Sequence, residues 1–544
     1  MPLSYASVPS CLLGGAPHPM TLSSIANALA PEFILLVASC IVLMLGIIRS
    51  STATTFVSIT SLLAVAVALV VTLKQDAPID PAVCPGLWLT SLTFYTRVIT
   101  LSVGLLIVLA NWNQAIDRER GEYMAMILLS LLGILLTASA NDWIVFFFAI
   151  ELVSIPTYVL VALSREDRRS SESSVKYFFL GALSAAILAY GLSFLYGAAG
   201  TTTMYTLGTG SPLSTLAGEP AASPAALIGL LLVFSGLLFK IAAVPFHVYA
   251  ADVYEGAASP VTGMLGFVPK LAGFVALIKV FAAFNWALPS EVVWVVWIVA
   301  AASMTVGNTL ALVQRNAKRT LAYSSIAHTG YMLVALLVGP VDGHGPMRDG
   351  LAALLFYMAV YGVMNLGAFA FLGAYQTRGR DVETLDDLAG MATRAPAAAL
   401  GLAICIFSLM GFPPTAGLIG KVYVFSGAFT IGVGHPFRSP LIALAIIAVV
   451  NTAIGAAYYL RIVSAAYVGT PSDNLQRIGG PPIRWALAMC ALAMLALFAA
   501  PAPLSRAAKD ATTVVHRSLR PANRLTTNNA PNPSFPPPVP ATQP

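Results

Sequence analysis

The chain has 544 residues, of which 58% are hydrophobic and only 10% are charged. Because soluble proteins carry about 25% charged residues, this composition excludes a soluble globular protein and indicates a membrane protein. The net charge of +6 does not indicate nucleic-acid binding, since the Lys and Arg residues lie in short loops and not on one amphipathic face.

Apolar runs long enough to cross a bilayer, roughly 17–25 residues each, recur along most of the chain. We count about fourteen of them, near residues 31–48, 54–73, 94–112, 123–139, 142–162, 176–197, 225–246, 259–282, 291–312, 321–339, 350–374, 396–427, 438–467 and 483–500. They predict an all-α polytopic membrane protein with about 14 transmembrane helices, in a transmembrane domain over residues 30–500.

The two ends of the chain depart from this pattern. Residues 1–29 form an N-terminal extension that lacks the basic start of a signal peptide, and Met20 within it would also be a natural start. Residues 501–544 become rich in Pro and Asn, and this composition predicts a disordered tail.

The basic residues predict how the chain is oriented in the membrane. Lys and Arg concentrate in the loops after the odd-numbered runs, for example at Arg165, Arg168 and Arg169, whereas the alternate loops hold almost none. By the positive-inside rule, the basic loops lie inside and both termini lie on the outer side, as an even number of spans requires.

Sequence motifs for metals, clusters and nucleotides are absent. The five cysteines include no C-x-x-C pair, so the chain has neither zinc nor iron–sulfur spacing. It also has no G-x-G-x-x-G and no G-x-x-x-x-G-K-[ST] sequence. We therefore expect no cofactor and no metal in this chain, and electrons in any associated redox reaction travel elsewhere.

One carboxylate lies deep inside an apolar run. Glu151 follows Asp142 by nine residues in "NDWIVFFFAIELVSIPTYVLVAL", which places it roughly 13 Å into the span. An ionisable group in hydrocarbon costs on the order of 2.5–3.5 kcal/mol and marks a functional site by default. Glu151 is therefore expected to hold a nearby lysine charged or to carry a proton itself, and the alternative is a structural carboxylate bonded within the bundle.

The run "LLLVFSGLLFKIAAVPFHVYA" combines a lysine, Lys240, with a proline. Pro245 has no N–H group, so the carbonyl of Ile241, four residues earlier, loses its helical partner. A lysine beside a freed carbonyl indicates a polar, hydrated spot inside the membrane. The alternative is that Lys240 extends its side chain to the interface.

The stretch "GFPPTAGLIGK" at 411–421 has the same character. Pro413 and Pro414 free the carbonyls of Leu409 and Met410, and Lys421 follows at once. Irregular backbone at membrane depth is tolerated only where protein buries it or water reaches it. Interrupted helices with ionisable groups are typical of transporter sites, and the offset of about five spans between the two lysines favours an inverted repeat.

Two further lysines and a histidine lie in apolar runs. Lys270 lies about ten residues into its run, directly after Pro269, whereas Lys279 near the end of that run is interpreted as an interface lysine. His328, in "LAYSSIAHTGYMLVALL", is either a packing residue or a proton relay, since imidazole titrates near neutral pH.

Several long motifs carry a resemblance to a known family. They are "ELVSIPTYVLVAL", "SSESSVKYFFLGALSAAILAYGLSFLYG", "FKIAAVPFHVYAADVYEGAASPVTGMLGFVPKLAGF", "RTLAYSSIAHTGYMLVAL" and "MGFPPTAGLIGKVYVF". The chain resembles the antiporter-like membrane subunits of respiratory complex I over nearly all of residues 30–500, and among them subunit N of NADH-quinone oxidoreductase. Lys421 fits the subunit N pattern, because subunit M would carry a glutamate there.

The resemblance implies a fold of fourteen helices with two inverted five-helix repeats, each containing a broken helix. It implies a proton path in which Glu151 pairs with Lys240, and Lys270, His328 and Lys421 continue a hydrated axis. His247 matches the histidine that follows the first broken helix. Pro269 departs from the family pattern, which has a small polar residue before the lysine.

The resemblance also implies the partners and the location of the chain. NADH, FMN, the iron–sulfur clusters and the quinone are expected in partner subunits, and the partners are the other membrane subunits of the respiratory complex, in the lipid bilayer of the bacterial inner (plasma) membrane. We therefore expect a subunit of a proton-pumping NADH:quinone oxidoreductase. The alternatives are a stand-alone or Mrp-type cation/proton antiporter subunit and a purely structural spacer, and the choice between proton and sodium ion stays open.

Overall fold

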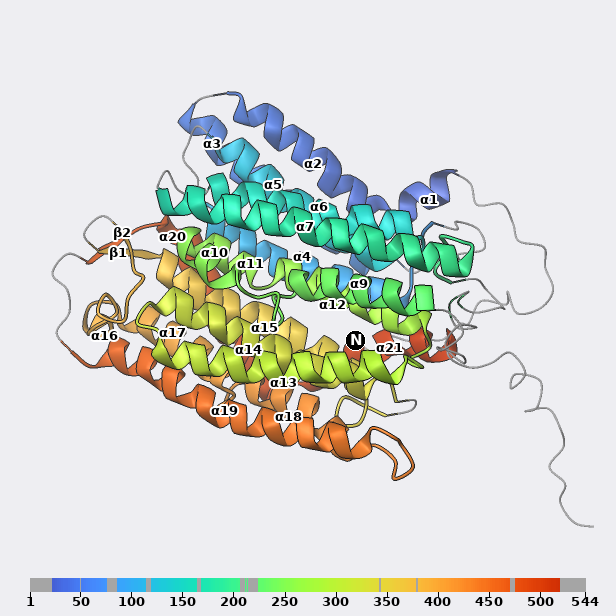
Figure 1. Ribbon diagram of the computed structural model, residues 1–544. Coiled ribbons are helices and arrows are strands. Elements are labelled where there is room, and N and C mark those ends of the chain that lie inside the picture. The colour runs from blue at the N-terminus through green and yellow to red at the C-terminus, as the bar shows by residue number, and fades with distance from the viewer. Residues whose placement is uncertain are drawn as a thin grey trace, which may run out of the picture.

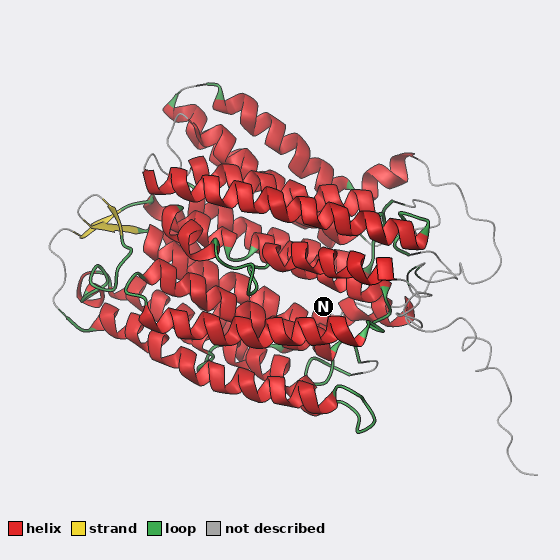
Figure 2. Cartoon of the chain, in the orientation of Figure 1, coloured by secondary structure: helices red, strands yellow, loops and turns green. Residues whose placement is uncertain are grey.

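The computed structural model of the protein describes residues 22–48, 50–75, 86–113, 119–163, 168–205, 211, 213, 224–341, 344–377, 380–469 and 475–518. Long helices lie side by side in one bundle, and a few short strands lie together at one end of it (Figures 1 and 2). Figure 1 also shows that α2 and α3 lie at one edge of the bundle and that α18 and α19 lie at the opposite edge.

The helices in chain order are α1 (Leu22–Ala28), α2 (Ala30–Gly46), α3 (Ser51–Leu73), α4 (Ser91–Asn111), α5 (Arg120–Ser139), α6 (Trp143–Leu163), α7 (Arg168–Ala199), α9 (Pro224–Lys240), α10 (Ala250–Gly256), α11 (Ser259–Leu265), α12 (Val268–Ala283), α13 (Ser290–Val313), α14 (Ala317–Val338), α15 (Gly350–Gly373), α16 (Met391–Arg394), α17 (Pro396–Met410), α18 (Ala416–Phe429), α19 (Arg438–Tyr467), α20 (Gly480–Ala499) and α21 (Ala502–Ser518). The strands β1 (Tyr375–Thr377), β2 (Arg380–Asp381) and β3 (Leu475–Arg477) form an antiparallel sheet in the order β2-β1-β3.

The predicted all-α membrane fold is confirmed. Eleven helical segments of the described chain are long and apolar enough to cross a membrane, and the shorter apolar helices are α2, α9, α17 and α18. Every predicted apolar run overlaps one of these segments or helices. The total of fourteen spans and the inverted repeats stay predictions.

The helices at the centre of the bundle are almost completely buried. In the segment Ser259–Ala283, which joins α11 and α12, the apolar window is completely buried, and in α15 it is 94% buried. By contrast, α3 exposes large apolar side chains such as Phe56 and Leu63, as a helix facing lipid does. Residues on α12, α14 and α15 can therefore interact without contact with lipid.

Both predicted helix interruptions are confirmed. Helix α9 ends at Lys240 and no further α-helix begins until Ala250, while α17 ends at Met410 and α18 begins at Ala416. Gly411, directly after α17, has φ +83°, a conformation that glycine adopts without steric cost. The structure adds a third, shorter interruption at residues 266–267, between α11 and α12.

The C-terminal segment differs from the predicted disordered tail at its beginning. Residues Ala502–Ser518 form α21, which packs on α4 and α15. Ala508, Ala511 and Thr512 are buried at the i, i+3 and i+4 spacing of one helix face, and the Thr512 hydroxyl donates to Asp349 at 3.2 Å. The Pro- and Asn-rich sequence begins only later, and residues 519–544 and 1–21 lie outside the described residues.

A buried ion pair joins α2 to α4. Arg97 Nη2 lies 2.6 Å from Glu32 Oε1, and Arg97 Nε donates to the same oxygen at 2.9 Å. Both residues are buried, and Arg97 Nη1 also donates to the side chain of Gln75 at 3.0 Å. Neither residue belongs to the proton path that the sequence analysis predicts. Because both are buried, each charge needs the other to offset the cost of its removal from water.

We expect Arg97→Met to destabilise the protein by about 3–5 kcal/mol, because it leaves the Glu32 carboxylate buried without its counter-charge. The double variant Glu32→Leu/Arg97→Met should recover most of this loss, since it removes both charges. The measurement is the thermal unfolding midpoint of the purified protein in detergent. A double variant no more stable than Arg97→Met would contradict this account of the pair.

Candidate functional site

The first helix interruption brings Glu151 and Lys240 together. Glu151 lies in the middle of α6, and Lys240 is the last residue of α9. Lys240 Nζ donates to Glu151 Oε1 at 2.8 Å and to Ser154 Oγ at 2.7 Å, and the Tyr158 hydroxyl lies 3.5 Å away. Both charged residues are buried, with exposed fractions of 5% for Lys240 and 9% for Glu151. The predicted contact between the two side chains is therefore present in the structure. Removal of either partner would leave the other charge buried and unpaired.

The carbonyl that Pro245 frees has found a new partner. The oxygen of Ile241 accepts a hydrogen bond of 2.8 Å from the hydroxyl of Thr329 on α14. The same hydroxyl accepts a bond of 2.8 Å from Lys270 Nζ, which also donates to the carbonyl of Ser325. The predicted polar spot at the first interruption is therefore real, and it includes Lys270 as well as Lys240.

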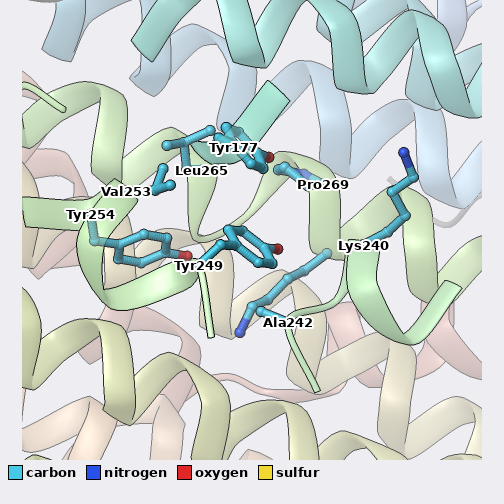
Figure 3. Close-up of a pocket in the computed structure, with 9 residues that line it drawn as sticks. Tyr177, Lys240, Ala242, Tyr249, Val253, Tyr254, Leu265 and Pro269 are labelled. Carbon is cyan, nitrogen blue, oxygen red and sulfur yellow. The ribbon is translucent and has the colours of Figure 1, made fainter. Parts of the chain in front are cut away.

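A small cavity is lined by both Lys240 and Lys270. It offers about 10 Å³ to the centre of a water molecule, which is close to the minimum for holding one water. Its lining includes Tyr177, Tyr249 and Tyr254, which Figure 3 shows around the cavity together with Lys240. Tyr177 and Tyr249 stack with ring centroids 5.2 Å apart. The cavity beside the two lysines is therefore small, and three tyrosine rings together with aliphatic side chains form its lining.

His328 lies in the middle of α14 and is held between two tyrosines. Its Nδ1 lies 2.6 Å from the hydroxyl of Tyr357 on α15, and its Nε2 lies 2.9 Å from the hydroxyl of Tyr459 on α19. Tyr459 bonds in turn to the hydroxyl of Ser324. His328 is completely buried, so both ring nitrogens interact with protein hydroxyls and neither contacts solvent directly.

The second helix interruption holds Lys421 as the sequence indicates. Lys421 Nζ donates at 2.8 Å to the carbonyl of Met410, which Pro414 deprives of its helical partner. The ammonium also lies 5.2 Å from the centre of the Tyr331 ring, a favourable cation–π distance. Lys421 is buried, with 5% of its surface exposed.

The structure does not join two other basic residues to this set. His247 lies on the segment between α9 and α10, and in the described chain no hydrogen bond connects it to another predicted site residue. Lys279 differs from its predicted place at the interface, because it is buried and its Nζ donates to the carbonyl of Ala140 at 2.5 Å. That carbonyl belongs to the C-cap of α5, where a cation is favoured by the helix dipole.

The sequence analysis missed the hydroxyl groups that connect the charged residues. Ser325 and Thr329 contact Lys270, and Tyr357 and Tyr459 contact His328. Ser325 and Thr329 are separated by four residues and flank His328, so all three lie on one face of α14. This run of polar residues within an apolar helix is a signal that could have identified the face.

A second group of charges ties the short helix α10, which is not a membrane-spanning segment, to two neighbouring helices. Asp252 accepts from Lys176 on α7 at 3.0 Å and from Arg319 on α14 at 2.9 Å. Partial burial alone would raise the pKa of Asp252, but the hydrogen bonds from these two cations outweigh it and hold the pKa below its ordinary value. Asp252 therefore stays ionised at neutral pH, and both cations remain attached to α10.

Comparison with known proteins covers almost the whole chain. The family model described as "NADH:quinone oxidoreductase/Mrp antiporter, TM" matches residues 140–455. NADH-quinone oxidoreductase subunit N of Rhodospirillum rubrum is 34% identical over 490 residues, which are 89% of this chain and 96% of that protein. Its counterpart from Paramagnetospirillum magneticum is 36% identical over 499 residues, covering 89% and 97%.

Solved structures show the same fold. A chain of respiratory complex I from Thermus thermophilus with bound aureothin matches with a TM-score of 0.70 and 30% identity, covering 88% of this chain and 99% of that one. A chain of the Mrp complex from Dietzia sp. matches with a TM-score of 0.75 and 22% identity, covering 92% and 100%. The second similarity shows the fold alone.

The packing of the second interruption can be tested at Gly417. A Cβ at this position would overlap the carbonyl oxygen of Ser408 on α17, so Gly417→Ala should destabilise the protein by about 1–3 kcal/mol through overpacking. The measurement is the thermal unfolding midpoint in detergent. Gly434→Ala is the matched control, because no atom lies within 4 Å of its Cβ position. Equal midpoints for the two variants would contradict this prediction.

Proposed function

Since the chain belongs to the family of membrane subunits shared by NADH:quinone oxidoreductases and Mrp antiporters, we propose that it serves as subunit N of a bacterial proton-pumping NADH:quinone oxidoreductase. Its own task is proton transfer within the membrane. NADH, FMN, the iron–sulfur clusters and the quinone belong to partner subunits, because the similar proteins are parts of multi-subunit respiratory complexes.

The observation that carries this proposal is the contact between Glu151 and Lys240 at an interrupted helix. A buried lysine loses proton affinity through desolvation and regains it from a nearby carboxylate. Lys240 is the last residue of α9, next to the interruption, and Glu151 is held on a separate helix, α6. A change in their separation of 2.8 Å would therefore load or unload a proton on Lys240.

Further groups extend from this pair toward α18. The cavity adjoins both Lys240 and Lys270, and Lys270 contacts Ser325, one turn before His328 on α14. The His328 ring nitrogens bond to Tyr357 and Tyr459. Tyr331, on the same helix α14, lies beneath the Lys421 ammonium. We infer that a proton moves along this series, with water completing the gaps, and that charge rearrangement in neighbouring subunits during quinone reduction drives it.

The test uses the intact assembly in native membranes. A C-terminal tag followed on a native gel should appear in a large band with NADH dehydrogenase activity. Glu151→Gln and Lys240→Ala should then lower proton pumping and quinone reductase turnover about tenfold or more, because the loss of a positioned proton carrier typically costs two to four orders of magnitude.

The exposed residue Glu291 supplies a matched control for this test. Its carboxylate lies at the start of α13, where it bonds to Ser290, so Glu291→Gln should leave pumping unchanged. Pumping at the wild-type rate in both site variants would sink the proposed proton path. A small inactive tagged band, with the host enzyme intact, would favour a free-standing cation/proton antiporter instead.

We further propose that both termini lie on the outer side of the membrane, as the distribution of Lys and Arg indicates. A protease added to intact spheroplasts should therefore remove the C-terminal tag. The same protease added to inverted vesicles should leave it in place. The reverse pattern would refute this orientation.

A further inference from the structure

The hydroxyl group of Thr329 contacts both Lys270 and the residue that follows Lys240. Thr329 Oγ1 donates to the carbonyl of Ile241 at 2.8 Å and accepts from Lys270 Nζ at 2.8 Å. Ile241 is the residue directly after Lys240, at the end of α9. Thr329 is therefore the direct hydrogen-bonded link between Lys270 and the backbone that carries Lys240.

We propose that Thr329 is a positioning residue that couples the charge of Lys270 to the backbone conformation next to Lys240. This inference rests on the proposed function and adds a means by which one lysine controls the other. Thr329 is buried and acts through these two contacts, without carrying the transferred proton itself.

The Thr329 hydroxyl has only one hydrogen to donate, so its bond to Ile241 depends on the charge of Lys270. A hydroxyl has one hydrogen to donate and two lone pairs to accept with. An ammonium has only donors, so charged Lys270 must donate to Thr329, and the single hydroxyl hydrogen is free for Ile241. The Ser325 carbonyl is a second acceptor for this hydrogen, but it lies 3.2 Å from Thr329 Oγ1, whereas the Ile241 carbonyl lies at 2.8 Å and has the shorter hydrogen bond.

Loss of the proton from Lys270 reverses this arrangement. A neutral amine has a lone pair, so Lys270 then competes with the Ile241 carbonyl for the single Thr329 hydrogen, and the bond to Ile241 is weakened or lost. Pro245 has already removed the helical partner of that carbonyl. A buried carbonyl without any partner is costly, so the segment after Lys240 must shift, or water must reach it from the cavity beside Ala242.

The segment after Lys240 has the character of a hinge. Ala242 has φ +54°, a left-handed conformation that is unfavourable for a residue with a side chain and that persists only where the surroundings hold it. Further along this segment, the amide of Val244 donates a hydrogen bond of 2.9 Å to the hydroxyl of Ser303 on α13. A small loss of anchoring at Ile241 can therefore change the position of Lys240 relative to Glu151.

Other titratable groups also face Lys270 and are part of its electrostatic environment. They are Tyr361 on α15, whose ring centre lies 5.6 Å from Nζ, Tyr254 on α10, Tyr177 on α7, Tyr249 beside α10, Lys240 across the cavity and His328 on the same helix as Thr329. Each of the four tyrosines is neutral near pH 7, so the charges that can change nearby belong to the lysines and the histidine.

The test is the pH profile of proton pumping by the complete complex in proteoliposomes. Thr329→Val removes the hydroxyl with little change in shape. It should lower pumping about threefold or more and move the alkaline limb of the profile to lower pH by about one unit, a tenfold loss of proton affinity, because the Lys270 ammonium loses an acceptor. Thr329→Ser keeps the hydroxyl and should restore both the rate and the limb.

Two comparisons separate failure of this inference from failure of the proposed function. Thr320→Val is the matched control, since among the described residues the Thr320 hydroxyl donates to the carbonyl of Asn316, the N-cap of the same helix, and its profile should match the wild type. If Lys270→Ala abolishes pumping while Thr329→Val keeps the wild-type rate and profile, the inference on Thr329 is wrong and the proposed function stands. If Lys270→Ala and Lys240→Ala both pump normally, the proposed function itself is wrong.

Assembly is checked first, by the activity band on a native gel. Thr329→Ala replaces the valine variant if the latter does not assemble. As a second readout, pulse-labelled hydrogen exchange of residues 241–249 at fixed pH should be faster in the hydroxyl-free variant than in Thr329→Ser. Equal exchange in the two would overturn the coupling to the hinge.

Discussion

The satisfaction of backbone carbonyls inside the membrane is the constraint on which this structure depends. In hydrocarbon no water replaces a lost helical hydrogen bond, so a carbonyl freed by proline must find a partner within the protein. The Ile241 carbonyl finds the hydroxyl of Thr329, and the Met410 carbonyl finds the ammonium of Lys421. At both interruptions, the group that satisfies the backbone either is a buried lysine or bonds to one. The break in the helix and the charge beside it are thus mutually dependent.

The three central lysines are not equivalent. Lys240 has a carboxylate at 2.8 Å, whereas among the described residues no carboxylate lies within ion-pair distance of Lys270 or Lys421. These two are held instead by carbonyl and hydroxyl oxygens and by the faces of tyrosine rings. Uncharged partners compensate a buried charge less well than an opposite charge does. The ammonium form is therefore better stabilised by its partners at Lys240 than at Lys270 or Lys421. The energy of a charge placed on each of these three lysines is accordingly different.

The sequence was sufficient to predict the membrane fold, both long interruptions and the burial of Glu151, Lys240, Lys270 and Lys421, because hydropathy, proline and lysine act locally. It could not predict partners that depend on packing between distant helices. The ion pair of Glu32 with Arg97 joins residues 65 positions apart, and His328 bonds to Tyr459 across 131 positions. Lys279 illustrates the opposite error, since its place near a helix end suggested the interface, whereas the neighbouring C-terminus of α5 holds it inside. The helix α21 was hidden by a composition averaged over the whole tail.

The direction of the series of contacts has an electrical consequence. Each step leads from one helix to the next, from α6 and α9 through α14 and α15 to α18 and α19, and these helices lie side by side across the bundle (Figure 1). In the proposed transfer, a proton that moved between these helices at constant depth would travel in the plane of the bilayer. It would do no work against the membrane potential, which amounts to about 2.3 kcal/mol per charge per 100 mV for a full crossing. Such lateral steps would be electrically silent, and the dependence of the transfer rate on voltage would then arise where a proton passes between the aqueous phases and this row of residues.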